Sequence, residues 1–581
     1  MNCSVSVHHA SKSHFSDNLL SRVSLVTTFL CSVLFYQIGF SQTVHKQFNA
    51  PSTSLPTHYY RWNYFDINNI KATINNYGPF ADYLRTSSAG LEWPKGSRKT
   101  ALFSAGIWIA GIHRPTGELR TAIQYYQSEY QAGPIAGVFN TTTIDSTVIS
   151  DPSDNRYRVY KLNKTYSDTM ADSQQWPGDL GAPYIDVNAN GTWERGIDKP
   201  NIFADQLLWS VYNDAFYKNR DVVKRTKPMG IEIQASYFGW DYVFLKDIMF
   251  LRWKVINKSN AYYDSVFFGI WNDPDLGNLN DDGIGVDISR NLVYTYNCDD
   301  VDQGANGYQL SPPAYGIVLL QGPNKKTSMR DSAYFNDSWH RGFQSLQITS
   351  FVPTFSLTDC DDCDILFFAH HMYNMLNGFN AEGTPFIDPH TTTPTKFVFS
   401  GDPVTQVGWY QSDSLSIGGT DVRGVVSAGP FTFAPNDTQE VIAAIILSQK
   451  ENRLASITKL RFVTDLTREF FYDKYQIFEN TPPAEDISSA PQEFFLTQNF
   501  PNPFNPTTTI SFAVPDMGNP LPTKLAIYDV LGRTVSVLIN QSISAGLHSV
   551  EWNAAGLASG VYYYSLSIGG MVQTKKMILQ R

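Results

Sequence analysis

Short apolar and aromatic segments separated by turn residues recur along residues 42–478, a pattern typical of proteins built mainly from β-strands. Eight of these segments predict strands: Thr100–Ile112, Arg120–Tyr130, Tyr157–Leu162, Gly230–Phe238, Ile248–Asn257, Tyr315–Leu320, Phe343–Val352 and Glu440–Ser448. Apolar and polar residues alternate only partly in Ile248–Asn257, so we expect some strands to be buried on both faces. Residues 42–478 are therefore predicted to form a mainly β, multi-domain β-sandwich body with two subdomains.

One part of the body follows a helical period instead. Apolar residues recur at helical spacing from Leu454 to Phe470, which predicts one long helix over residues 451–475. We expect its apolar stripe to pack against the last strand of the body. Three prolines among small and acidic residues then indicate a linker over 479–491.

Residues 492–581 predict a separate small domain. Six short strands are separated by glycine-containing or proline turns: Thr509–Val514, Lys524–Val530, Arg533–Ile539, Leu547–Trp552, Val561–Ile568 and Val572–Leu579. This spacing of strands and turns is typical of an immunoglobulin-like β-sandwich.

Composition excludes two broad classes of protein. The 581 residues are 14% aromatic and 17% charged, whereas disordered chains are poor in aromatics and rich in charge. The net charge is −10, so there is no excess of positive charge for binding nucleic acid. Residues 1–41 and 492–581 each carry +1, so the acidity belongs to the body, at −12.

The N-terminal residues 1–41 have the layout of a Sec signal peptide. A polar region with Lys12 and Arg22 precedes an apolar run over 23–40, and small residues follow near Ser41. The alternative is a single membrane anchor, because 18 residues could almost span a bilayer. We expect cleavage after export to the periplasm, which leaves no transmembrane segment in the mature chain.

Three cysteines remain after removal of the signal peptide: Cys298, Cys360 and Cys363. Three thiols in an oxidising compartment allow one disulfide, either within the Cys-x-x-Cys pair or from one of that pair to Cys298. A zinc knuckle would need further ligands, and the sequence has no second Cys-x-x-Cys.

The first of three acidic segments, residues 181–198, resembles the opening of a calcium loop. Its candidate ligands are Asp186, Asn188, Asn190 and Asp198. Oxygens at alternate positions followed by Gly191 can converge on one ion, because glycine makes the sharp turn. The closing Glu of an EF-hand would fall at Ile197, so Asp198 would close a looser site. The alternative is an Asx-rich turn that satisfies its own backbone.

The second segment, Trp271–Asp287, holds five carboxylates that repel one another unless a cation or water screens them. They are Asp273, Asp275, Asp281, Asp282 and Asp287, in a loop between strands predicted over Asp264–Ile270 and Asn291–Tyr296. We expect a metal-binding or structural loop, with calcium as the ion. The alternatives are a solvated turn, or the acid and base of glycoside hydrolysis, which needs two carboxylates flanking a sugar bond.

The third segment, Cys360–Asp364, leads into an apolar run with adjacent histidines, His370 and His371. We expect residues 365–374 to form a strand, in which neighbouring side chains face opposite sides. The two histidines could not then bind one metal from that strand, and a packed or hydrogen-bonded role is favoured.

The C-terminal residues resemble a known family. The matching phrases are Phe495–Thr507, Ile527–Arg533, Ala545–His548, Trp552–Asn553, Leu557–Tyr564 and Thr574–Leu579. They are similar to the C-terminal sorting domain of type IX secretion cargo, found in Bacteroidetes and their relatives. The resemblance implies recognition by the type IX machinery, passage through the outer membrane, and release or attachment at the cell surface. The alternative is an ordinary immunoglobulin-like module that stays on the mature protein.

Lys575 and Lys576 lie beside the apolar residues of the final strand and present a charged, extended edge that a receptor could recognise. We therefore expect the two lysines to belong to the sorting signal.

Several phrases of the body, among them Glu92–Gly96, Gly106–Gly111 and Gly181–Asp186, resemble a group of large exported proteins with the same tail and no defined activity. The resemblance implies an origin and an architecture but no reaction. In that group the loop ending at Asp287 often carries Cys where this chain has Val286, so the disulfide pattern of the group does not transfer directly.

Two functions remain open from the sequence. It contains no HExxH, no GxSxG, no phosphate loop and no dinucleotide fingerprint. We therefore expect a secreted or surface-displayed structural and interaction protein, stabilised by calcium, whose exposed aromatics bind a surface polysaccharide or other extracellular polymer. The alternative is a secreted polysaccharide-acting hydrolase that uses loop carboxylates.

Overall fold

The computed structural model describes most of the body and the C-terminal domain. The described residues are 61–83, 88–124, 128–144, 146–215, 226–242, 244–304, 306–335, 338–354, 365–411, 421–472, 495–499, 502–515 and 519–580. The predicted signal peptide over 1–41, the predicted linker over 479–491, and both Cys360 and Cys363 lie outside these residues.

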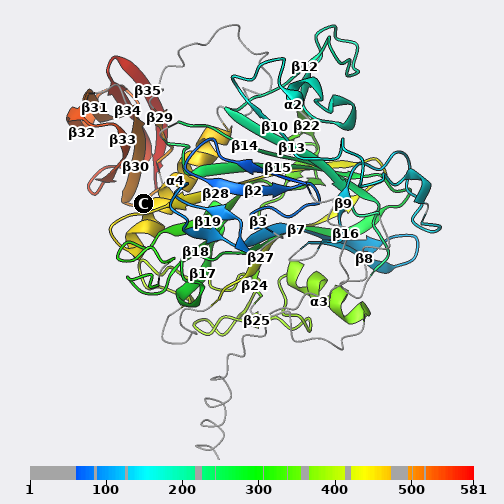
Figure 1. Cartoon of the computed structure of the whole chain (residues 1–581). Coiled ribbons are helices and arrows are strands. Elements are labelled where there is room, and N and C mark those ends of the chain that lie inside the picture. The colour runs from blue at the N-terminus through cyan, green and yellow to red at the C-terminus, as the bar shows by residue number, and fades with distance from the viewer. Residues whose placement is uncertain are drawn as a thin grey trace, which may run out of the picture. The chain divides into compact units, whose positions relative to one another are not determined.

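The largest element of the body is a nine-stranded antiparallel sheet (Figure 1). Its strands lie in the order β10 (Tyr160–Asn163), β13 (Gln206–Asn213), β14 (Ile231–Gly239), β15 (Ile248–Asn257), β28 (Thr438–Ser448), β19 (Ala314–Gln321), β18 (Leu292–Asn297) and β17 (Asp282–Asp287), and β9 (Gln131–Ala132) also pairs with β13. The centre of the sheet is β28, which pairs with β15 on one side and β19 on the other.

A five-stranded antiparallel sheet forms the second layer. Its order is β24 (Ser350–Pro353), β27 (Gly424–Phe433), β16 (Tyr263–Asp273), β7 (Ser104–His113) and β8 (Glu118–Ile123). A four-stranded sheet of β1 (Trp62–Phe65), β2 (Lys71–Asn75), β5 (Leu91–Glu92) and β6 (Thr100–Leu102) is formed by the first part of the body.

The main hydrophobic core lies between the two large sheets. Trp253 of β15 and Phe268 of β16 contact each other there, with ring centroids 5.8 Å apart. All eight residues of β13 are buried, and in β15 only Lys254 and Ile256 are half-buried, as expected for strands covered on both faces. The burial of β15 explains the weak alternation of Ile248–Asn257, and the two packed sheets confirm a mainly β, sandwich-type body.

A helix covers the outer face of each large sheet. The helix α4 (Arg453–Phe470) packs Ile457 and Leu460 on β28, which confirms the expected partner of the apolar stripe. It begins within two residues of the predicted start, where Asn452 accepts a hydrogen bond from the Ala455 N–H at 2.9 Å. The helix α3 (Ile365–Leu376) covers the other sheet and buries Met372, Met375 and Leu376 against it.

The helix α3 corrects the sequence prediction for His370 and His371, which expected a strand over 365–374. Met372, Met375 and Leu376 recur at helical spacing and bury one face of α3, but within a continuous apolar run this period cannot be told from that of a buried strand. In the helix, His370 is exposed and His371 is half-buried.

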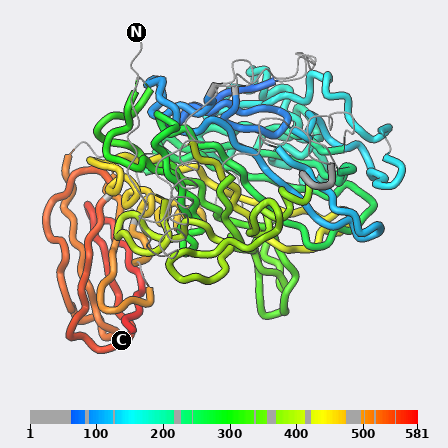
Figure 2. The backbone as a smooth tube through the Cα atoms, turned by 90° about the horizontal axis from the view of Figure 1, so that it is seen from below, coloured from blue at the N-terminus to red at the C-terminus, as the bar shows by residue number. Residues whose placement is uncertain are grey.

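The described part of the body also contains five two-stranded sheets and one short α-helix. They are β3 (Asp82–Tyr83) with β4 (Ser88–Ala89), β11 (Tyr184–Ile185) with β12 (Lys199–Pro200), β20 (Asn324–Lys326) with β23 (Phe343–Ser345), β21 (Ser332–Phe335) with β22 (Ser338–Arg341), β25 (Phe386–Ile387) with β26 (Pro394–Thr395), and α2 (Ala171–Gln174). The green hairpin of β21 and β22 projects from the body (Figure 2). The strand predicted over Phe343–Val352 is in fact two strands, β23 and β24, which belong to different sheets.

The C-terminal domain has the six predicted strands and one short addition. The strands β29 (Phe495–Leu496), β30 (Thr507–Val514) and β33 (Gly546–Asn553) form one sheet, and β32 (Thr534–Ile543), β31 (Leu521–Tyr528), β34 (Gly560–Ile568) and β35 (Met571–Leu579) form the other. The two sheets enclose a core that includes Phe512, Leu525, Tyr564 and Met577. The predicted small sandwich is confirmed.

Candidate functional site

Three carboxylates lie close together at one edge of the five-stranded sheet, where β16 ends and the neighbouring strand β27 begins. Asp273 is the last residue of β16, Asp275 follows it, and Asp421 precedes β27. The two segments are brought together because Asn272 of β16 pairs with Gly424 of β27. One carboxylate oxygen from each aspartate lies within 4.8 Å of those of the other two.

One arginine offsets part of this negative charge. Arg423 Nε lies 3.2 Å from Asp273 Oδ1, and Arg423 Nη2 lies 2.7 Å from Asp421 Oδ2. Three carboxylates and one guanidinium leave a net charge of −2 when all are ionised, which one divalent cation would neutralise. The second oxygen of Asp421, Oδ1, is buried without a hydrogen-bond partner among the described residues.

Burial and repulsion from its neighbours disfavour ionisation of Asp275. Burial, Asp273 and Asp421 together raise the pKa of Asp275 well above its ordinary value. Burial and the nearby Asp273 also raise the pKa of Asp82 to about 7. Calcium binds oxygen ligands at about 2.3–2.6 Å, so two ligands of one ion lie at most about 5 Å apart. The separation of these carboxylates fits a calcium ion.

The other three carboxylates of Trp271–Asp287 do not join this group. Asp282 is fully buried, and its Oδ2 accepts a hydrogen bond from the Leu276 N–H at 3.0 Å. Asp281 accepts a hydrogen bond from the Asn278 side chain at 3.2 Å. Burial is the main cause of a raised pKa for both carboxyls. For Asp282 the pKa lies well above its ordinary value.

Asp287 lies at the end of β17 and forms ion pairs with Arg290 at 2.8 Å and Arg461 at 3.6 Å. These arginines and the Ser289 hydroxyl outweigh the effect of burial and lower the pKa of Asp287. Its charge is therefore balanced by the protein itself.

The loop between β11 and β12 holds the first set of predicted calcium ligands. Asp186 accepts hydrogen bonds from the N–H groups of Asn190 and Gly191, at 3.1 and 2.6 Å. Asp198 accepts hydrogen bonds from the N–H groups of Val187 and Glu194, at 3.0 and 2.7 Å. These contacts are those of the Asx-rich turn, the alternative that the sequence left open.

The two asparagines of that loop are directed at Glu194. The side-chain amides of Asn188 and Asn190 each donate to Glu194 Oε2 at 2.6 Å. Both asparagines are exposed. Calcium binding by this loop stays a prediction.

The remaining predicted residues lie apart from these sites. Cys298 follows β18 and is half-buried, and its pairing stays a prediction because both other cysteines lie outside the described residues. On β35, Lys575 forms an ion pair with Glu469 and Lys576 is exposed. Lys576 therefore has the accessibility that recognition by a receptor requires.

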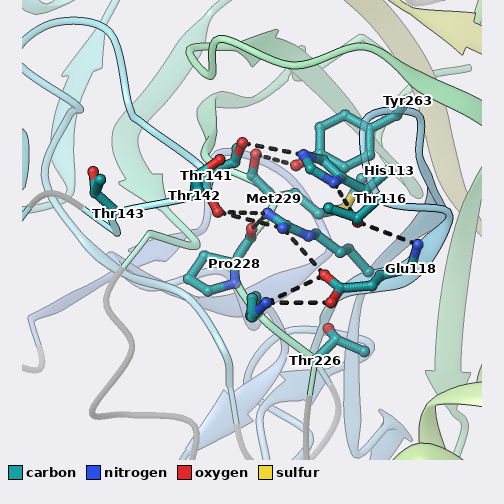
Figure 3. Close-up of polar contacts among 12 residues, drawn as sticks. His113, Thr116, Glu118, Thr141, Thr142, Thr143, Thr226, Pro228, Met229 and Tyr263 are labelled. Carbon is teal, nitrogen blue, oxygen red and sulfur yellow. Dashed lines mark hydrogen bonds and ion pairs between the residues drawn. The ribbon is translucent and has the colours of Figure 1, made fainter.

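A buried polar cluster around His113 is a second candidate site (Figure 3). The Thr141 hydroxyl donates to Asn260 Oδ1, so it accepts from His113 Nε2 at 3.1 Å. Thr116 accepts from the Glu118 N–H and donates to His113 Nδ1 at 2.7 Å. This network fits a neutral imidazole with its proton on Nε2.

The surroundings of His113 resist its protonation. The buried Arg120 donates to the Pro228 carbonyl at 3.0 Å and carries a positive charge near the ring. Burial first, and then Arg120, lower the pKa of His113 to about 4. Because His113 is fully buried and hydrogen-bonded through both nitrogens, its role is to join β7 to the neighbouring loops, without access to a substrate.

The lowered pKa of His113 predicts that the stability of the folded protein depends on pH. The ordinary pKa of histidine is about 6.5, so the unfolded chain binds a proton more tightly than the folded chain. We expect the His113 contribution to stability to be complete above about pH 6.5 and to be lost progressively as the pH falls toward 4. Thermal unfolding measured from pH 7 to pH 4 should show a weaker pH dependence for His113→Gln than for the wild type. Equal dependence in the two proteins would contradict a neutral, buried His113.

A cavity of about 240 Å³ lies on the outer face of the nine-stranded sheet. Its walls are Gly181–Tyr184 and Asn201 on one side, and residues of β13, β14 and β15 on the other: Trp209, Gln234, Ser236, Arg252 and Lys254. Among the described residues that line it, two are cationic, Arg252 and Lys254, and none is a carboxylate.

Sequence reasoning missed Asp421, Arg423 and Asp82. The first two form an Asp-Val-Arg triplet ahead of a strand, and Asp82 lies in a two-residue strand. Neither context carries a recognisable motif. Their proximity to Asp273 depends on the pairing of distant strands, which a linear spacing does not show.

No described helix combines the length and the apolar character that crossing a membrane requires. A search of curated proteins found no match to the chain. Among solved structures, a polysaccharide lyase aligns with 60% of this chain and 34% of its own, at 8% identity and a TM-score of 0.18. The alignment spans about a third of that protein, and so low a score supports no functional argument.

The family of secretion system C-terminal sorting domains matches residues 498–580. The matched residues are those of the small sandwich, whose strands and turns agree with the resemblance seen in the sequence. Such a tail indicates a secreted or cell-surface protein. Residues 498–580 are therefore a C-terminal sorting domain, and the chain is a cargo protein of the type IX secretion system.

Proposed function

We infer that this protein is a structural or interaction protein of the cell exterior, whose body is stabilised by a calcium ion at Asp273, Asp275 and Asp421. The meeting of three carboxylates from two separate segments, within 4.8 Å, carries the inference. An ion at this position would join the end of β16 to the segment that leads into β27. Its partner outside the cell would be a polymer or a neighbouring surface bound by exposed aromatic side chains.

Calcium should raise the melting temperature of the purified protein. Sites in extracellular modules have dissociation constants of about 10⁻⁴–10⁻³ M, and calcium at 100 times its dissociation constant stabilises a protein by about 2.7 kcal/mol. A melting scan in EDTA, followed by one with 10 mM calcium, should therefore show an increase of a few degrees. The increase should be lost in an Asp275→Asn/Asp421→Asn variant.

Two control variants make this test specific. Asp151→Asn changes the charge of an exposed carboxylate that accepts a hydrogen bond only within its own turn, and it should keep the calcium response. Asp186→Asn asks whether the loop between β11 and β12 contributes. An unchanged melting temperature of the wild type in EDTA and in calcium would reject the calcium site.

Hydrolysis of a polysaccharide is the second candidate function. It is favoured by one observation, the raised pKa of the Asp275 carboxyl beside Asp273, which resembles an acid and base pair. Burial of Asp273 and its ion pair with Arg423 support the structural role instead. Turnover of polysaccharides by the wild type, abolished in Asp275→Asn, would favour the hydrolase.

A further inference from the structure

The hairpin of β21 and β22 has two chemically different faces. Its register places Tyr334 opposite Trp339 and Ser332 opposite Arg341. Because side chains alternate along a strand, these four residues share one face, here called the outer face. The inner face is anchored by Phe335, which is buried and stacks on His340 with ring centroids 4.0 Å apart.

The outer face presents a large aromatic surface to solvent. Trp339 is 66% exposed, although tryptophan usually buries much of its area. Tyr334 lies edge-on against it, with ring centroids 5.7 Å apart. This contact, together with the anchored inner face, fixes the position of the indole before any ligand arrives.

Positive charge surrounds this aromatic pair. Residues 324–345 contain four basic and two acidic side chains, in a body whose net charge is −12. The basic residues are Lys325, Lys326, Arg330 and Arg341, and all four are exposed. Such a local reversal of charge attracts a polyanion. It also attracts the acidic surfaces of a second copy, so the test below has to separate polymer binding from self-association.

The chemistry of the outer face favours one class of partner. The flat face of an indole can pack against the C–H face of a sugar ring, while neighbouring lysines and arginines pair with carboxylate or sulfate groups. A lipid surface would need a broad apolar face, whereas the exposed side chains among the described residues of 325–335 and 338–341 are polar or charged apart from Met329 and Trp339.

We propose that the outer face of the β21–β22 hairpin binds an acidic polysaccharide, with Trp339 stacking on a sugar ring and Arg341 pairing with an anionic substituent. The proposal rests on the function inferred above, since it names the polymer that the exported protein contacts. It does not depend on the calcium ion, because no member of the Asp273 cluster belongs to the hairpin.

The test measures binding of the purified protein to chondroitin sulfate, which carries carboxylates and sulfates, and to uncharged dextran. Calorimetry or affinity electrophoresis in EDTA should show binding to chondroitin sulfate only, weakened by salt. Trp339→Ala and Arg341→Ala should each weaken it about tenfold. Trp62→Ala, which removes another partly exposed indole beside a tyrosine, should leave it unchanged.

The proposal would be overturned if the protein did not bind chondroitin sulfate, if it bound dextran equally well, or if Trp62→Ala weakened binding as much as Trp339→Ala. Stronger association with anionic phospholipid vesicles, or self-association that only Trp339→Ala abolishes, would also overturn it. The melting scan with calcium tests a different site. If the protein does not bind chondroitin sulfate but calcium still raises its melting temperature, only the hairpin site is rejected. If it binds chondroitin sulfate but calcium leaves the melting temperature unchanged, only the calcium site is rejected.

Discussion

A variant that lacks residues 572–581 is expected to accumulate in the periplasm and to be absent from the cell surface. The deletion removes nearly all of β35, which pairs with β34 along its whole length. It also removes Met577 and Leu579 from the core of the sorting domain. Both the fold of the domain and the edge offered to the secretion machinery are therefore lost. Cell fractionation and protease treatment of intact cells measure the outcome.

Two further variants separate recognition from folding. Lys575→Ala/Lys576→Ala keeps the apolar residues of β35 and should reduce surface delivery if the lysines belong to the signal. Leu531→Ala changes an exposed residue in the turn between β31 and β32 and should be delivered normally. Normal surface delivery of the truncated protein would contradict a sorting role for the C-terminal strand.

The second large effect is expected from the buried ion pair between β15 and β28. Arg252 and Glu440 are 4% and 2% exposed, and Arg252 Nε donates to Glu440 Oε1 at 2.5 Å. Arg252→Ala leaves the Glu440 carboxylate buried without this partner. Removing one member of such a pair costs about 3–5 kcal/mol. Lys254, which lies opposite Glu440 in the register, should reduce this loss without removing it.

A double replacement tests whether the loss comes from an uncompensated charge. Arg252→Met/Glu440→Leu removes both charges and keeps apolar volume, so it should lose less stability than Arg252→Ala. Urea denaturation of the three proteins gives the free energies of unfolding. A loss below about 1 kcal/mol in Arg252→Ala would show that water or Lys254 already screens Glu440.

The strands that sequence reasoning located best are those bounded by clear turns. In the sorting domain, glycines and a proline separate segments of six to eight residues, and all six strands lie where the turns predict them. The helix α4 was found because its apolar residues keep helical spacing over many turns. The helix α3 was missed because a short apolar run fits a buried strand and a buried helix equally well.

The candidate metal site was only partly visible in the sequence. Asp273 and Asp275 are near neighbours, so their mutual repulsion can be read from the sequence. Asp421 becomes their neighbour only through the pairing of β16 with β27. In the loop of Asp186, the sequence allowed both a calcium site and a self-satisfied turn. The choice between them depends on backbone geometry, which composition does not determine.

The central position of β28 has a consequence for the order of folding. Residues 438–448 come almost last in the body, yet they join β15 to β19. The strands on either side, β10 to β15 and β17 to β19, cannot be joined into one sheet until β28 has been synthesised. Pairing between segments so far apart in the sequence slows folding. The sheet is therefore completed only after most of the body has been synthesised, and its two halves cannot form one continuous sheet before then.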